Sequence, residues 1–133
     1  MVGASVAKIV SLKSSMITTK ISGLNTHMNY NIREKWLAIC IFRNPVEKGQ
    51  NYNVTGNTKW KICGSKSIAQ KCLNEWVRDG EHILIRMIQC KEIGRLIKDY
   101  GMWNGKDAQT VVQELTGVAN EIVSMASELG VKI

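Results

Sequence analysis

Basic and aromatic residues are interleaved between positions 30 and 71, and their chemistry suits the binding of a polyanion. The stretch KGQNYNVTGNTKWKICGSKSIAQK, residues 48–71, contains five lysines, a tyrosine and a tryptophan and no acidic residue. Single-stranded nucleic acid is held by cationic side chains that neutralise its phosphates and by aromatic rings on which its bases stack. The residue types in this stretch therefore favour nucleic-acid binding.

The positive charge is concentrated in the first half of the chain. Residues 1–71 carry 11 Lys and Arg against 2 Asp and Glu, whereas residues 72–133 carry 7 against 9. The formal net charge of +7 is thus the balance of a +9 half and a −2 half. If the basic half folds onto one face, its potential attracts phosphate-rich partners through counterion release.

Strand alternation sorts these residues into contacts and core. In TKWKIC, Lys59 and Lys61 fall on one face of a strand and Trp60 on the other, so we predict solvent-facing lysines and a buried tryptophan. Tyr52, in a loop bounded by glycines, is the better candidate for base stacking. The predicted nucleic-acid contacts are Arg33, Lys35, Arg43, Lys48, Tyr52, Lys59, Lys61, Lys66 and Lys71.

Catalytic and metal-binding patterns are absent from the sequence. It contains no GxxxxGK[ST], GxSxG or HExxH motif, and each of its three aspartates lies at the end of an expected helix. The four cysteines form no CxxC pair, which favours reduced cysteines acting as small core residues rather than a zinc site. We therefore predict a protein that is not an enzyme, with no catalytic residue, metal, cofactor or small-molecule substrate.

Hydrophobic periodicity predicts four strands, near residues 6–22, 35–43, 58–63 and 82–90. The first is interpreted as a strand rather than a transit peptide, because it alternates and lacks arginine. A long hairpin spanning 35–63 is the simplest arrangement of the next two. Helices are expected from Ser67, which has capping-box spacing with Gln70, to Gly80, and again over residues 92–101.

The strongest helical pattern begins after Asp107, a plausible N-cap, and extends to about Leu129. Its apolar residues step by three and four, as in a coiled-coil seam. Two interpretations remain open: an amphipathic helix that covers a sheet, or a helix that pairs with its copy in a homodimer. The residues predicted for an oligomer interface are Val111, Leu115, Val118, Ile122, Met125 and Leu129.

Together these patterns predict one domain over residues 1–133, of the α+β class. It would hold an antiparallel sheet of about four strands, helices on one side and a long C-terminal amphipathic helix. The expected function is largely sequence-tolerant binding of RNA or single-stranded DNA, with self-association through the last helix. The alternative is a matrix-like or scaffold protein that assembles at anionic membrane surfaces. With no apolar secretory segment, an intracellular location, cytoplasmic or nuclear, is expected.

Overall fold

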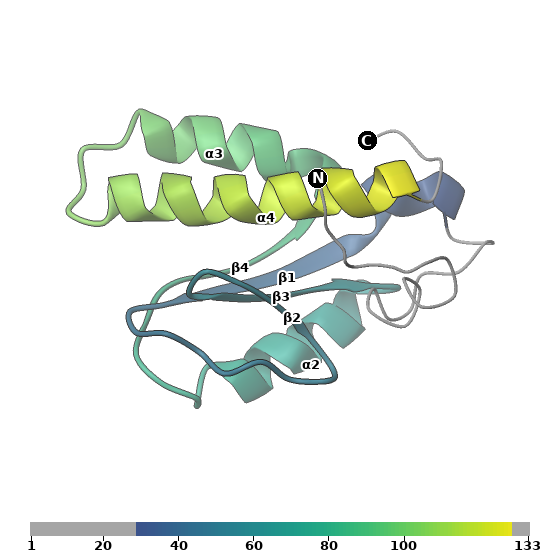
Figure 1. The fold of residues 1–133 in the computed structure, drawn as a ribbon, viewed down its shortest axis with the longest axis horizontal. Helices are drawn as coiled ribbons and strands as arrows, with labels where there is room; N and C mark the ends of the chain where they lie inside the picture. The colour runs from purple at the N-terminus through teal and green to yellow at the C-terminus, as the bar shows by residue number, and fades with distance from the viewer. Residues whose placement is uncertain (1–28, 129–133) are drawn as a thin grey trace.

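The computed structural model of the chain describes residues 29–128 (Figure 1). The strand predicted at 6–22 and the predicted interface residue Leu129 lie outside this range. The described elements are η1 (Asn29–Glu34), β1 (Trp36–Phe42), β2 (Asn53–Thr55), β3 (Thr58–Cys63), α2 (Lys66–Trp76), β4 (His82–Gln89), η2 (Cys90–Glu92), α3 (Ile93–Gly101) and α4 (Ala108–Glu128).

The four strands form one antiparallel sheet in the order β2-β3-β1-β4. The predicted hairpin is confirmed, because β1 pairs with β3 from Trp36↔Cys63 to Ile41↔Thr58. β4 lies on the other side of β1, in register from Trp36↔Gln89 to Ile41↔Leu84. The short strand β2, hidden in the long connection, was not predicted.

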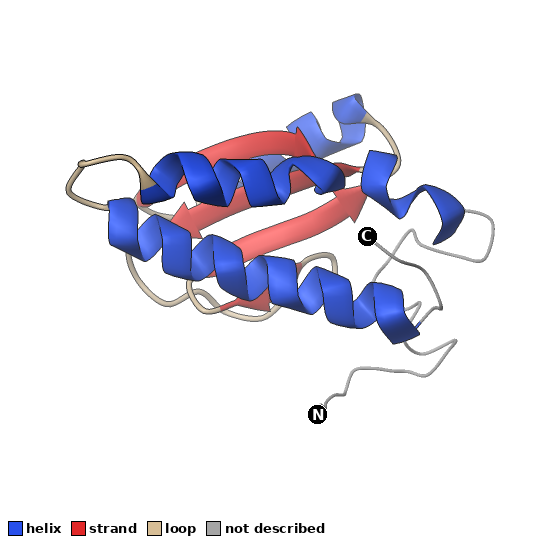
Figure 2. Cartoon of the chain, turned by 90° about the horizontal axis from the view of Figure 1, so that it is seen from above, coloured by secondary structure: helices blue, strands red, loops and turns tan. Residues whose placement is uncertain are grey.

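The sheet is the middle layer of three. The helices α3 and α4 cover one face and α2 covers the other, as Figure 1 shows edge-on and Figure 2 shows from the α3–α4 side. The α+β class, the four-stranded antiparallel sheet and the long last helix are confirmed. The expectation of helices on one side is wrong, because β1 is buried on both faces and each face requires a cover.

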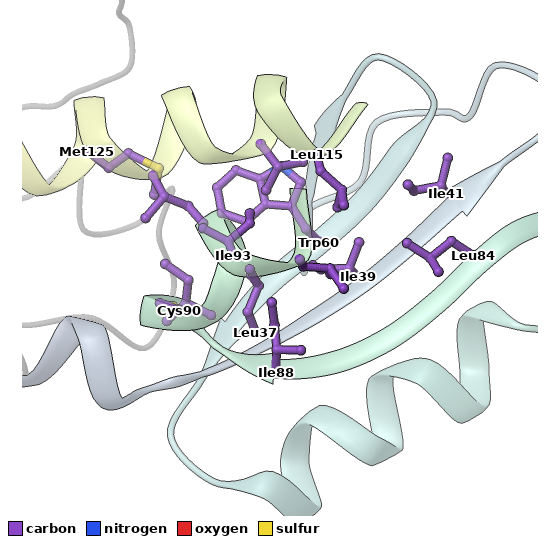
Figure 3. Close-up of a cluster of buried hydrophobic side chains, with 14 of the residues drawn as sticks. Leu37, Ile39, Ile41, Trp60, Leu84, Ile88, Cys90, Ile93, Leu115 and Met125 are labelled. Carbon is purple, nitrogen blue, oxygen red and sulfur yellow. The ribbon is translucent and has the colours of Figure 1, made fainter. Parts of the chain in front are cut away.

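The side chains of β1 alternate between two separate cores. Leu37, Ile39 and Ile41 point towards α3 and α4, where they join Trp60 and Leu115 (Figure 3). The alternate residues of β1 point towards α2 and pack with Ala69, Leu73 and Trp76. Trp60 is 1% exposed, as expected for a core tryptophan.

The heptad stripe of α4 faces the chain's own sheet. Its five described members are at most 2% exposed, so they are part of the core: Val111, Leu115, Val118, Ile122 and Met125. The predicted use of these residues as an oligomer interface is therefore corrected, since burial in the core leaves them no surface for a second copy. The spacing of three and four reflects one buried face of a helix packed on a sheet.

Gly117 shows why α4 tolerates a glycine in its interior. A β-carbon at this position would lie 3.1 Å from the Cγ2 atom of Thr55 in β2, tighter than ordinary contact. The glycine thus lets the helix approach the edge strand closely. This contact offsets the helical cost of glycine, which is about 1 kcal/mol.

The start of α2 differs from the prediction by two residues. Ser65, not Ser67, is the N-cap, and its hydroxyl accepts a hydrogen bond from the backbone N–H of Ile68 at 3.3 Å. The helix ends at Trp76, before Gly80. No helix within residues 29–128 combines the length and apolar character needed to span a bilayer.

Candidate nucleic-acid interface

The charge balance of the described residues is smaller than that of the whole chain. Lys8, Lys13, Lys20 and Lys132 lie outside residues 29–128, which leaves 14 Lys and Arg against 11 Asp and Glu. The total charge of these residues is therefore a weak indicator of an anionic partner. The capacity to bind an external anion depends instead on which cations are already paired with carboxylates and which are available.

Lys59 is not available. Its Nζ atom lies 2.6 Å from Oδ2 of Asp79 and 4.5 Å from the centroid of the Tyr52 ring, and the residue is 7% exposed. Burial lowers the pKa of Lys59, but the hydrogen bond and charge of Asp79 outweigh that effect and raise it above 10.5. The prediction of a solvent-facing Lys59 is wrong, because α2 covers this face of β3.

Arg43 is committed to a structural network. Its Nε atom lies 2.9 Å from Glu81, and its Nη2 atom lies 3.0 Å from Asp107. The hydrogen bond and charge of Arg43 hold the pKa of Asp107 below its ordinary value of 3.8, against a smaller opposing effect of burial. Arg43 therefore ties the end of β1 to the segments before β4 and α4, and is not the free phosphate contact that was predicted.

Tyr52 contributes to the wall of a cleft rather than serving as an open stacking platform. Its hydroxyl donates a hydrogen bond to the carbonyl oxygen of Glu47 at 3.0 Å. Its ring meets Trp76 in a T-shaped contact, with centroids 5.8 Å apart, and Lys59 lies against the ring. The half-buried ring is thus held by three neighbours, which corrects the stacking role expected from the loop.

Five of the predicted lysines make no ion pair within the part of the chain that the structure describes: Lys35, Lys48, Lys61, Lys66 and Lys71. Lys48, Lys66 and Lys71 are exposed, whereas Lys35 and Lys61 are half-buried. Lys66 lies 5.5 Å from the ring centroid of Trp36. Lys61 and Lys71 both line a hollow of about 510 Å³ between β3, α2 and the loop at Asn51, which we call the basic cleft.

The lining of the basic cleft is mixed. Its apolar part comes from Ile68, Cys72 and Trp76, and its acidic part from Glu75 and Asp79. Asp79 is paired with Lys59, so Glu75 is the one acidic residue of the lining that makes no ion pair within residues 29–128. Lys61 and Lys71 therefore outnumber the carboxylate that could neutralise them. Sequence reasoning did not place these two acids beside the lysines.

A second hollow, of about 630 Å³, adjoins the first. Asn51 and Tyr52 lie in the walls of both. Lys48 lines the second hollow together with residues of the following loop and of β2, and Glu121 of α4 closes it. Lys48 therefore lines one hollow and Lys61 and Lys71 line the other, and the two hollows share Asn51 and Tyr52.

The remaining predicted contacts lie elsewhere. Arg33 is exposed on η1 and Lys35 is half-buried before β1, and neither lines either hollow. Sequence reasoning also missed Trp103, which is 52% exposed between α3 and α4. The sequence feature that could have indicated an exposed tryptophan is its place in the glycine-bounded segment GMWNG.

Nucleophilic and metal chemistry find little support among the described side chains. Burial raises the pKa of Cys40 to about 11 and that of Cys63 and of Cys90 to about 12. These thiols are therefore protonated at neutral pH, which makes them poor nucleophiles. Within residues 29–128, no three His, Cys, Asp or Glu side chains lie close enough together to hold a metal ion.

The arrangement suits anion binding at the basic cleft and its neighbour. Comparison of the chain with protein-family profiles, with curated proteins and with solved structures gave no significant match.

Proposed function

We propose that the protein binds single-stranded nucleic acid with little sequence preference, through phosphate contacts from Lys48, Lys61, Lys66 and Lys71. The observation that supports this most is that Lys61 and Lys71, which make no ion pair within residues 29–128, both line a hollow of about 510 Å³. Apolar and aromatic residues line the same hollow, so it offers surface to sugars and bases as well as charge to phosphates.

The size of the expected effect follows from the number of lysines. Each phosphate neutralised on a single strand contributes about −0.7 to the slope of log affinity against log salt, so four contacts give about −3. Raising the salt from about 50 to about 200 mM should then weaken binding about 50-fold.

The test is fluorescence anisotropy with a labelled oligothymidylate over a salt series. Lys61→Gln/Lys71→Gln should weaken binding at low salt and make the slope shallower by about 1.4, because two phosphate contacts are lost. The matched control is Arg86→Gln/Arg95→Gln, which removes the same charge from two exposed residues away from the cleft.

Two results would refute the proposal. The first is absence of binding by the wild-type protein at low salt. The second is an equal loss in the cleft variant and in the control, which would show that only net charge matters.

Vesicles of acidic and of neutral lipid, tested with the same variants, address the alternative of an anionic membrane. If the protein floats with acidic vesicles but does not bind the oligonucleotide, the membrane function replaces this proposal.

A further inference from the structure

The turn between α3 and α4 exposes an indole ring that the fold holds in place. Trp103 is 52% exposed, and its ring meets that of Tyr100 in a T-shaped contact with centroids 5.5 Å apart. A β-carbon at Gly105 would come within 2.0 to 2.3 Å of three carbons of the six-membered ring. Such similar separations from adjacent atoms place Gly105 against one face of the indole.

A hollow of about 390 Å³ lies at this ring. Besides the two aromatic residues, its lining includes Asn104 and Gln109, which carry amide side chains, and Val112. Aromatic walls with a few amide groups suit a planar molecule that carries hydrogen-bond donors and acceptors at its edge. Lys98 precedes the turn in the sequence and Lys106 lies near its end. Both are exposed, and neither makes an ion pair within residues 29–128.

We propose that this hollow, which we call the Trp103 pocket, accepts one unpaired nucleobase, with the base stacked on the indole and its edge facing Asn104 and Gln109. This inference rests on the proposed function and assigns to Trp103 the stacking role that the sequence suggested for Tyr52. Base stacking on an aromatic side chain is tolerant of sequence, because every base has a π-face.

The geometry favours a base over a lipid interface. A ring that inserts into a bilayer projects from the surface, whereas this indole lies against the backbone of Gly105. Two amide side chains beside it would have to give up their water in a membrane without gaining partners. A base offers them hydrogen bonds instead.

The experiment uses the full chain with two labelled probes of equal length: an oligothymidylate and its abasic analogue, which has the same phosphates. Trp103→Ala should weaken binding of the oligothymidylate about 5- to 100-fold and change binding of the abasic probe less than twofold. Trp103→Phe should retain most of the affinity, because a phenyl ring also stacks. The salt slope should stay at the wild-type value, in contrast to that of the lysine variants.

Two further variants separate the ring from its surroundings. Met102→Ala removes a neighbouring side chain that is 78% exposed and should leave binding of both probes unchanged. Gly105→Ala keeps the indole but displaces it, since the new β-carbon would overlap the ring, so it should reproduce the selective loss.

The outcomes distinguish the two proposals. If the wild-type protein binds neither probe, the proposed function fails and the Trp103 pocket falls with it. If it binds both probes with salt dependence and Trp103→Ala changes nothing, or changes both equally, only the pocket is refuted. A loss of acidic-vesicle binding in Trp103→Ala, with oligonucleotide binding unchanged, would assign the ring to a lipid interface.

Discussion

The ion pair between the buried Lys59 and the exposed Asp79 leads to a specific prediction about stability. Asp79→Ala leaves the Lys59 ammonium beneath Tyr52 and Phe42 without a carboxylate, whereas Lys59→Met removes the charge and keeps an apolar chain of similar length. We therefore expect Asp79→Ala to destabilise the fold and Lys59→Met to be nearly neutral.

The magnitude depends on how far water reaches the pair. Removing one partner of a fully buried ion pair costs about 3–5 kcal/mol. Here the side chain of Lys59 is 9% exposed but that of Asp79 is 44% exposed, so water can replace part of the lost interaction. A hydrogen bond to a charged group contributes about 1.5–3 kcal/mol, and we expect a loss of about 2 kcal/mol for Asp79→Ala.

Urea denaturation followed by tryptophan fluorescence measures this loss. For an m-value of about 2 kcal/mol per M, the midpoint of Asp79→Ala should fall by about 1 M, and Lys59→Met/Asp79→Ala should recover most of the difference. A midpoint for Asp79→Ala equal to that of the wild type, or an equal fall in Lys59→Met, would refute the reasoning.

The pair should also be visible in the pH dependence of unfolding. Because folding raises the pKa of Lys59 above 10.5, its contribution is complete below pH 10.5 and disappears as the pH rises through the folded pKa. The three buried cysteines titrate in the same range, so the quantity to follow is the stability of the wild type relative to Lys59→Met, which lacks the titrating amine. The wild type should lose stability relative to Lys59→Met at high pH, and a relative stability that does not change with pH would contradict the assignment.

Two further predictions concern a turn and the thiols. Glu114 accepts hydrogen bonds from the backbone N–H of Asn57 at 2.9 Å and from Oγ1 of Thr58 at 2.7 Å, so Glu114→Ala should lower the free energy of unfolding by about 2–3 kcal/mol. An unchanged urea midpoint would show that water replaces the carboxylate. In the native protein at pH 8, a thiol reagent should modify the half-exposed Cys72 first, while the three buried cysteines react only after unfolding. Mass spectrometry of partly labelled protein identifies the site, and early labelling of Cys63 would contradict the burial described.

Elements with strong local patterns could be predicted from the sequence. β3 occupies residues 58–63 as expected, and α4 begins at Ala108, directly after the predicted N-cap Asp107, because alternation and a seven-residue repeat are signals carried within one segment. The continuous apolar run WLAICIF, residues 36–42, is typical of a strand that is buried on both faces. That signal already required helices on both sides of the sheet, but the predicted architecture did not use it.

The site was harder to predict, because it depends on contacts between distant segments. Lys59 and Asp79 are 20 positions apart, and Arg43 and Asp107 are 64 apart, so composition alone could not show that these cations are neutralised within the fold. Charge counting treats every lysine as available to a ligand. The structure reduces the predicted basic set to the residues that make no ion pair within residues 29–128.

The central position of β1 has a consequence for how the chain reaches this fold. Six of the seven residues of WLAICIF are buried, and their covering layers come from segments that are synthesised later, α4 last of all. Until α4 is complete, one face of this β-prone apolar strand stays open to other chains. We expect the nascent protein to require protection by a chaperone, or rapid docking of α4, more than its modest size suggests. A charge introduced at Ile39 would remove that hazard only at the expense of the core.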